Sequence, residues 1–143
     1  MIEHTSWNLT GPEDLEARLA LFDSAAADSP IRLAIVDLGG CRLAGTIGFH
    51  AVSARDASAE LAYDLSPDYW GRGIATAICR TVTLWSYEAL RLQRVQAIVL
   101  ETNTRSERVL CKCGFEYEGL LRSYRRVRGV PGNFKMYSRL ATD

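Results

Sequence analysis

Two glycines in a seven-residue run, Trp70 to Thr76, constrain this chain most, because the run joins a strand pattern to a helix pattern. From Arg72 to about Ala89, apolar residues recur at helical spacing, which predicts an amphipathic helix. The first amides of a helix lack partners within the helix, and glycines let an anion approach them closely. The run therefore predicts a phosphate site at a helix start. A ligand-free turn, with glycines for tight packing, would give the same pattern.

The segment before the glycine run alternates with the two-residue period of a strand. One face carries Leu61, Tyr63 and Leu65, and the other carries Glu60, Ala62 and Asp64. The two faces of this strand therefore carry different chemistry.

The rest of the chain divides into short periodic segments separated by turn residues. Helices are predicted over about 13–27, after the capping box Thr10 to Glu13, and over a short segment that starts at a second capping box, Thr104 to Glu107, and ends at Gly114. Strands are predicted over 31–35 and 43–49 as a hairpin, over 95–100, and over about 115–122 and 134–140, the last two joined through 129–132. This order predicts one α/β (α+β) domain, 1–143, with a mixed, mostly antiparallel sheet and a central right-handed βαβ crossover.

Composition excludes several classes of function. The 17 basic and 17 acidic residues balance, so a general nucleic-acid partner is not expected. There is no apolar run long enough for a membrane span and no leader-like start, so the cytoplasm is the expected location. Cys79, Cys111 and Cys113 are expected to be packing thiols, since Cys111-x-Cys113 lacks the spacing of zinc or redox pairs. His4 and His50 have no partners at ligand spacing, so no metal site is assigned.

Several motifs in fixed order carry a family resemblance. A Pro67-Asp68-Tyr69-Trp70 turn precedes the glycine run, and the segment Asn103 to Phe115 reads N-x-x-S-x-x-V-L-x-K-x-G-F, followed by Glu118 to Arg122 as E-G-x-L-R. Over about residues 30 to 140, the chain resembles the GCN5-related N-acetyltransferases (GNAT), and within them the RimJ/RimL-type ribosomal-protein N-terminal acetyltransferases. The resemblance implies a GNAT-like sheet that lacks the family's first strand and the helix associated with it.

The resemblance also implies acetyl-coenzyme A as the acetyl donor. Its pyrophosphate would lie on the backbone amides of Gly71, Arg72, Gly73, Ile74, Ala75 and Thr76. In this family the preceding strand splays from its parallel neighbour, and the pantetheine pairs with the free edge, here Tyr63, Asp64 and Leu65. Asn103 resembles the asparagine that contacts the pantetheine arm, although a plain helix cap would look the same. Trp70 stands where the wider family often has Gln or Arg, and packing beside the loop is the favoured interpretation of its indole.

Two residues are candidates for catalysis. Glu60 matches a position where relatives carry a carboxylate thought to act as base, and a solvated or salt-bridged carboxylate is the alternative. Many family members protonate the leaving thiolate with a tyrosine, but that position is Leu110 here. Ser106 matches the serine proposed for this role in the RimJ/RimL branch, and a role limited to the first helical turn is the alternative.

The favoured function is direct transfer of acetyl from coenzyme A to an amine, most readily an N-terminal α-amine. An α-amine, with a reference pKa of about 7.7–8.0, needs less help to lose its proton than a lysine at about 10.4. A coenzyme-A-binding sensor without turnover is the alternative that Leu110 suggests. A third hypothesis is an RNA adaptor that uses the arginines at 122, 125, 126 and 128. A homodimer is also expected, because a sheet without the first strand would expose an edge.

Overall fold

The computed structural model describes residues 28–143 together with Glu13. The helix expected over about 13–27, its capping box and the expected lack of the family's first strand therefore fall outside the described residues, apart from Glu13. From Asp28 onward, the order of elements agrees with the sequence prediction.

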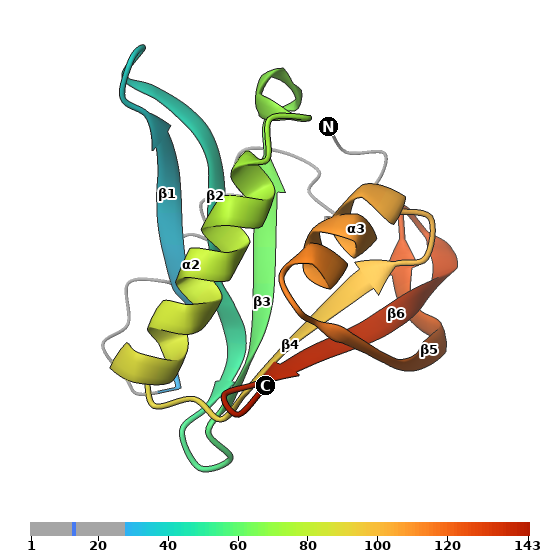
Figure 1. The fold of residues 1–143 in the computed structure, drawn as a ribbon. Helices are drawn as coiled ribbons and strands as arrows, with labels where there is room; N and C mark the ends of the chain where they lie inside the picture. Colours follow the sequence, from blue (N-terminus) through green and yellow to red (C-terminus); the bar gives the residue numbers. More distant parts are fainter. Residues whose placement is uncertain (1–12, 14–27) are drawn as a thin grey trace.

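Six strands of the described chain form one sheet in the order β1-β2-β3-β4-β6-β5. All neighbouring pairs are antiparallel except β3 and β4, which are parallel. The elements are β1 (Ile31–Asp37), β2 (Arg42–Ser53), β3 (Ser58–Leu65), the short 3₁₀ helix η2 (Pro67–Tyr69), α2 (Ile74–Ala89), β4 (Arg94–Leu100), α3 (Thr104–Lys112), β5 (Glu116–Val127) and β6 (Val130–Leu140). This arrangement confirms the predicted mixed sheet with its βαβ crossover through α2 (Figure 1).

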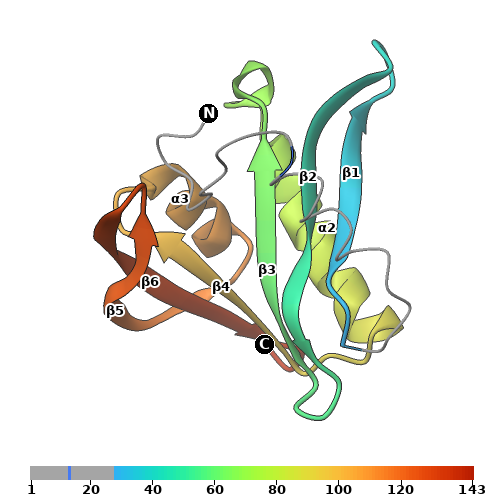
Figure 2. The ribbon, with the colours of Figure 1, turned by 180° about the vertical axis from the view of Figure 1, so that it is seen from behind.

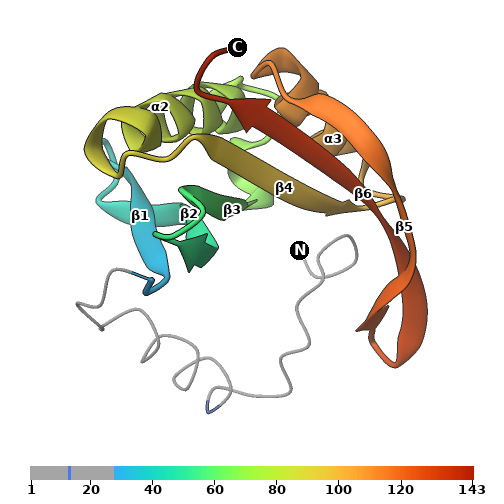
Figure 3. The same ribbon diagram turned by 90° about the horizontal axis from the view of Figure 1, so that it is seen from below.

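Both helices cover the same face of the sheet, as the view along its edge shows (Figure 3). The main core lies between that face and the helices, with Phe49 on β2, Leu61 on β3, Val95 on β4, Cys79 on α2 and Leu110 on α3 all buried. Leu61 and Leu65 are buried, which agrees with the predicted apolar face of β3. The opposite sheet face carries polar side chains, Glu60 among them.

The sheet opens between β3 and β4. Only three register pairs join the two strands, and the last is Glu60↔Gln96. Beyond that pair the strands diverge. Figure 2, which views the sheet from the side opposite to the helices, shows β3 and β4 separating. This is the splay that the family resemblance implies. It leaves the edge of β3 beyond Glu60 without a strand partner on the β4 side.

Four local details differ from the sequence prediction. The helix predicted from Arg72 starts at Ile74, because Gly73 is in the left-handed region and acts as N-cap. The N-cap of α3 is Asn103 rather than Thr104, since the Asn103 side chain accepts from the Ser106 amide. The last hairpin turns at 128–129 rather than through 129–132, because both turn residues have positive φ (50° and 81°), which suits a two-residue turn. Cys111 is exposed, so it is not a packing thiol, whereas Cys79 and Cys113 are buried.

Candidate active site

A cleft of about 700 Å³ lies where β3, the glycine run and α3 meet. Sixteen residues line it: Tyr63, Asp64, Leu65, Tyr69, Trp70, Gly71, Gly73, Ile74, Ala75, Thr76, Asn103, Arg105, Ser106, Arg108, Val109 and Lys112. The fold thus brings together, from three separate segments, the predicted coenzyme-binding residues with the exception of Arg72. Ser106 also lines the cleft, whereas Glu60 does not.

The glycine run forms a backbone cradle at the start of α2. Gly71 and Gly73 have φ values of 73° and 75°, which side chains rarely tolerate. A Cβ built on either glycine would meet no atom within 4 Å, so the space beside the backbone is open. The first intrahelical bond runs from the Ala77 amide to the Gly73 carbonyl, so the preceding amides have no partner within the helix. Open space, free donors and no acidic residue in the first turn fit an anionic group such as a pyrophosphate.

The exposed edge of β3 presents alternate peptide groups to the cleft. The Ser66 amide donates to the Ala44 carbonyl of β2 over 2.8 Å, so the peptide groups of Ser66 point toward β2. Because peptide groups alternate in direction along a strand, those of Tyr63 and Leu65 point toward the open gap. Asp64 pairs with Thr46 of β2 in the register, so its backbone peptide groups point toward β2. Of the three predicted edge residues, Tyr63 and Leu65 therefore have the geometry to pair with an extended ligand.

Trp70 ties the turn to the end of β3. Its indole Nε1–H donates to the Leu65 carbonyl over 2.8 Å. The Arg105 guanidinium lies 4.2 Å from the centre of the indole ring, which is a cation–π contact. The favoured packing interpretation agrees with these contacts, and the indole, 38% exposed, also lines the cleft.

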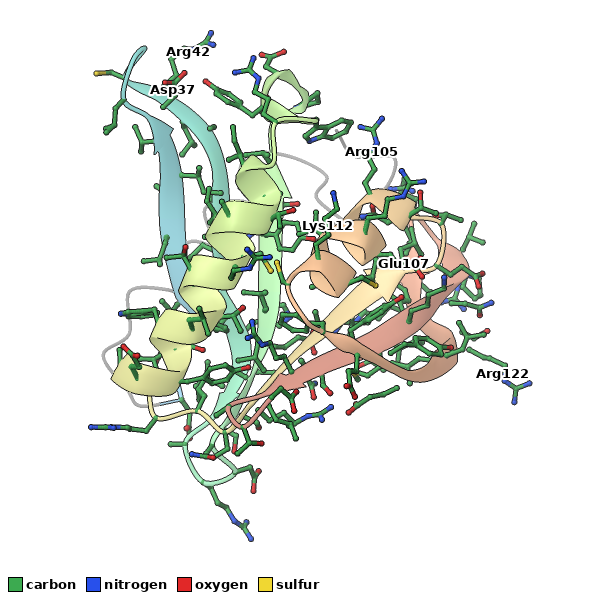
Figure 4. All side chains as sticks on the ribbon, in the orientation of Figure 1. Asp37, Arg42, Arg105, Glu107, Lys112 and Arg122 are labelled. Atoms are coloured by element: carbon green, nitrogen blue, oxygen red, sulfur yellow. The ribbon has the colours of Figure 1, made fainter. Side chains whose placement is uncertain are left out.

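Three cations of α3 that the sequence motifs did not indicate also line the cleft: Arg105, Arg108 and Lys112. Figure 4 shows Arg105 and Lys112 on the side of α3 toward the glycine run, and Glu107 on the side toward β6. The i, i+3, i+7 spacing would have revealed this face, since such positions share one side of a helix. The acidic residue of the cleft lining, Asp64, is paired with Arg32 over 2.8 Å. The cleft wall formed by α3 is therefore positively charged.

The first turn of α3 holds Ser106 in the cleft wall. The Asn103 side chain accepts from the Ser106 amide over 3.2 Å, so Asn103 caps the helix and lines the cleft as well. The Tyr63 hydroxyl donates to the Ser106 carbonyl over 3.4 Å, and burial raises the pKa of Tyr63 well above its usual range. Leu110 is fully buried in the core, which explains why an apolar residue is favoured there.

Glu60 lies on the opposite sheet face, at the point where β3 and β4 separate. Its side chain is 6% exposed and accepts from His50 Nε2 at 2.7 Å, Gln96 Nε2 at 3.4 Å and an Arg125 guanidinium nitrogen at 3.4 Å. Burial alone would raise the pKa of Glu60, but the hydrogen bond and the charge of His50, followed by the charge of Arg125, hold that pKa below its ordinary value. Glu60 is therefore a buried, ionised carboxylate.

Two other carboxylates of this face, Asp64 and Glu118, are paired with arginines. Asp64 lies 2.8 Å from Arg32, and burial raises the pKa of Asp64 although Arg32 opposes the rise. Glu118 lies 2.6 Å from Arg94, and the hydrogen bonds from Arg94 and Ser138 lower the pKa of Glu118 to about 2. Glu60, Asp64 and Glu118 are therefore charge-matched by arginines within the described part of the chain.

The arginines of the last hairpin do not act as one group. Arg125 contacts Glu60, and Arg126 donates to the Gly129 carbonyl. Arg122 projects away from the body of the molecule (Figure 4). In the described part of the chain, no cluster of three or more metal-binding side chains occurs. None of the helices described is long and apolar enough to cross a membrane.

Comparison with known proteins agrees with this geometry. Residues 2–116 match the family model described as Acetyltransferase (GNAT) domain. The chain is 34% identical over 136 residues to the uncharacterised N-acetyltransferase YoaA of Bacillus subtilis (strain 168), covering 92% of this chain and 77% of YoaA. It is 33% identical over 99 residues to the uncharacterised N-acetyltransferase p20 of Bacillus licheniformis, covering 69% of this chain but only 56% of p20.

Two solved structures share the fold. The ribosomal-protein-S5-alanine acetyltransferase of Vibrio fischeri has a TM-score of 0.87 at 22% identity, covering 99% of this chain and 80% of that one. The spermidine N-acetyltransferase of Vibrio cholerae, in complex with CoA and spermine, has a TM-score of 0.81 at 20% identity, covering 95% and 79%. The family match, the identity to YoaA and the shared fold lead to one conclusion: the chain belongs to the GNAT acetyltransferase family, whose members are acyltransferases that use acetyl-coenzyme A.

Proposed function

We propose that this protein transfers acetyl from acetyl-coenzyme A directly to the α-amine of a peptide or protein N-terminus, as a member of the RimJ/RimL branch. The observation that carries the choice of acceptor is the charge of the sheet face around Glu60. There Glu60, Asp64 and Glu118 each lie within ion-pair distance of an arginine. A polyamine such as spermidine carries several positive charges and needs unmatched carboxylates, whereas a single α-amine does not.

Under this proposal, each group of residues in the cleft has its own role. The amides of Gly71 to Thr76 would hold the pyrophosphate, the edge of β3 at Tyr63 and Leu65 would align the pantetheine, and Asn103 would contact the same arm. The bound donor supplies a thioester that an amine can attack. Ser106 would hydrogen bond to the departing sulfur, because it lines the cleft at the first turn of α3, where its backbone amide is capped by Asn103. Glu60 would supply negative charge, which stabilises the positive charge of the proton that leaves the amine.

The expected partners and location rest on other observations. A homodimer stays a prediction, and a nucleic-acid partner is still not expected because the hairpin arginines are divided among separate contacts. All four cysteines are free thiols, which suits a reducing cytoplasm.

The proposal is tested by release of free coenzyme A with a panel of acceptors. Peptides with a free N-terminus should be acetylated, and the same peptides with a formyl-blocked N-terminus should not. Spermidine and peptides whose only amine is a lysine side chain should react more slowly. Faster reaction with spermidine would favour a polyamine acetyltransferase. Coenzyme A binding without transfer to any acceptor would favour the sensor hypothesis.

Replacing Glu60 by glutamine should lower the turnover of the amine roughly tenfold near neutral pH, and less at high pH. The reason is that the amine loses its proton unaided as the pH rises. Because the pKa of Glu60 is held below its ordinary value, its charge persists through the whole neutral range. The difference between the variant and the wild type therefore does not come from titration of Glu60.

The measurement is a pair of pH–rate profiles, with coenzyme affinity measured in parallel. Glu118→Gln is the matched control, since Glu118 is another arginine-paired carboxylate on the same face. The control should keep wild-type turnover. Parallel profiles with equal rates for Glu60→Gln would remove Glu60 from the reaction.

A further inference from the structure

His50 and Glu60 form a close pair at the point where the sheet opens. They lie directly opposite each other in the register of β2 and β3, and Glu60 lies opposite Gln96 in the last pair that joins β3 to β4. Cross-strand partners share one face of a sheet. The His50 ring is therefore on the face away from the helices, beside the opening through which an acceptor amine would meet the thioester.

Glu60 is poorly suited to take a proton itself. Its carboxylate is buried and receives hydrogen bonds from three donors, on β2, β4 and β5. These donors stabilise its ionised form and leave the oxygens little room for an incoming ammonium. The His50 side chain, in contrast, is 38% exposed, against 6% for Glu60.

The hydrogen bond between the two residues also fixes the tautomer of His50. Nε2 lies 2.7 Å from a Glu60 oxygen, and an ionised carboxylate can only accept, so Nε2 carries the ring proton. In the neutral imidazole the lone pair is then on Nδ1. Within the described part of the chain, Nδ1 has no hydrogen-bond partner. An imidazole ring with one nitrogen available to accept a proton, and the other nitrogen held by a carboxylate, has the arrangement of a general base.

We infer that His50 is the general base of the reaction and that Glu60 is the positioning residue that orients it. This inference rests on the proposed function, since it assigns the proton-accepting atom of that same site. The step moves one proton from the ammonium nitrogen of the acceptor to Nδ1 and leaves a neutral amine that can attack the acetyl carbon. Glu60 stays ionised and stabilises the imidazolium that forms.

Other charged groups face this pair from neighbouring strands. Arg125 on β5 contacts Glu60, and Gln96 of β4 accepts from Arg94, which is paired with Glu118. Arg32 on β1, with Asp64, lies further along the same face. Each of these three arginines lies within ion-pair distance of a carboxylate.

The test uses His50→Ala in the full chain with the best peptide acceptor. The variant should lose about a hundredfold in kcat/KM for the amine, with unchanged affinity for coenzyme A. Added imidazole should restore part of the lost rate in proportion to its concentration, and it should not stimulate the wild type. A structural role for His50 would not be rescued in this way. Ser53→Ala is the matched control, since Ser53 is another β2 side chain bonded to a carboxylate, at 2.9 Å from Asp56, and it should keep wild-type rates.

The double variant with Glu60→Gln separates the two roles. If Glu60 acts through His50, the double variant should be scarcely slower than His50→Ala alone. A His50→Ala rate within twofold of wild type would overturn the inference. Loss of rate without imidazole rescue, together with a further full loss in the double variant, would also overturn it and make the carboxylate the base. Wild-type protein that transfers acetyl to no amine would instead disprove the proposed function, before any variant is compared.

Discussion

Replacing Gly73 by valine is expected to weaken coenzyme A binding about a hundredfold, a loss that corresponds to one or two charge-assisted hydrogen bonds. Gly73 lies in the cleft wall with a φ of 75°, and an added Cβ would meet no protein atom within 4 Å. The new side chain therefore points into space that a phosphate would occupy, and the positive φ disfavours a β-branched residue as well. Calorimetric titration with coenzyme A measures the effect.

Gly129 provides the control for the backbone strain alone. It has a φ of 81°, an added Cβ would also meet nothing within 4 Å, and it lies in the β5–β6 turn rather than in the cleft. Gly129→Val should show a similar loss of thermal stability and normal coenzyme affinity. If a folded Gly73→Val protein binds coenzyme A as tightly as the wild type, the phosphate site is not at this loop.

Local sequence patterns were sufficient to predict most of the fold. The alternation at 43–49 and 61–65 reflects strands with one face on the core, and the glycines at 71 and 73 indicate the turn into α2. The pattern failed in the last hairpin, where β5 extends to Val127 and β6 starts at Val130. Four arginines and Pro131 conceal the strand period there, and pairing across the hairpin holds the two strands instead.

The acceptor side of the site could not be predicted from local patterns, because it depends on strand register. Glu60 was a candidate from the family motif, but its partners lie 10, 36 and 65 positions away in the chain. No spacing rule connects His50, Gln96 and Arg125 to Glu60. The splay that opens the cleft is equally non-local, since it is set by where the pairing of β3 with β4 ends.

The cations of α3 lead to the second large effect. Arg108 and Lys112 line the cleft four residues apart on one helix face, and neither has an ion-pair partner among the residues described. Their charge is therefore available to a polyanionic ligand. Coenzyme A carries a pyrophosphate and a further phosphate. Replacing both cations by glutamates therefore turns attraction for this ligand into repulsion.

The double variant Arg108→Glu/Lys112→Glu should bind coenzyme A about a hundredfold more weakly at low salt. The deficit should shrink as salt is added, because screening weakens interactions between exposed charges. Arg55→Glu/Arg122→Glu makes the same change in net charge at exposed positions outside the cleft, in the β2–β3 turn and on β5. That control should lose little affinity, since only long-range repulsion acts on the ligand. Equal losses in the two double variants would mean that net charge, rather than the cleft wall formed by α3, governs binding. Unchanged affinity in the α3 variant would exclude these cations from the site.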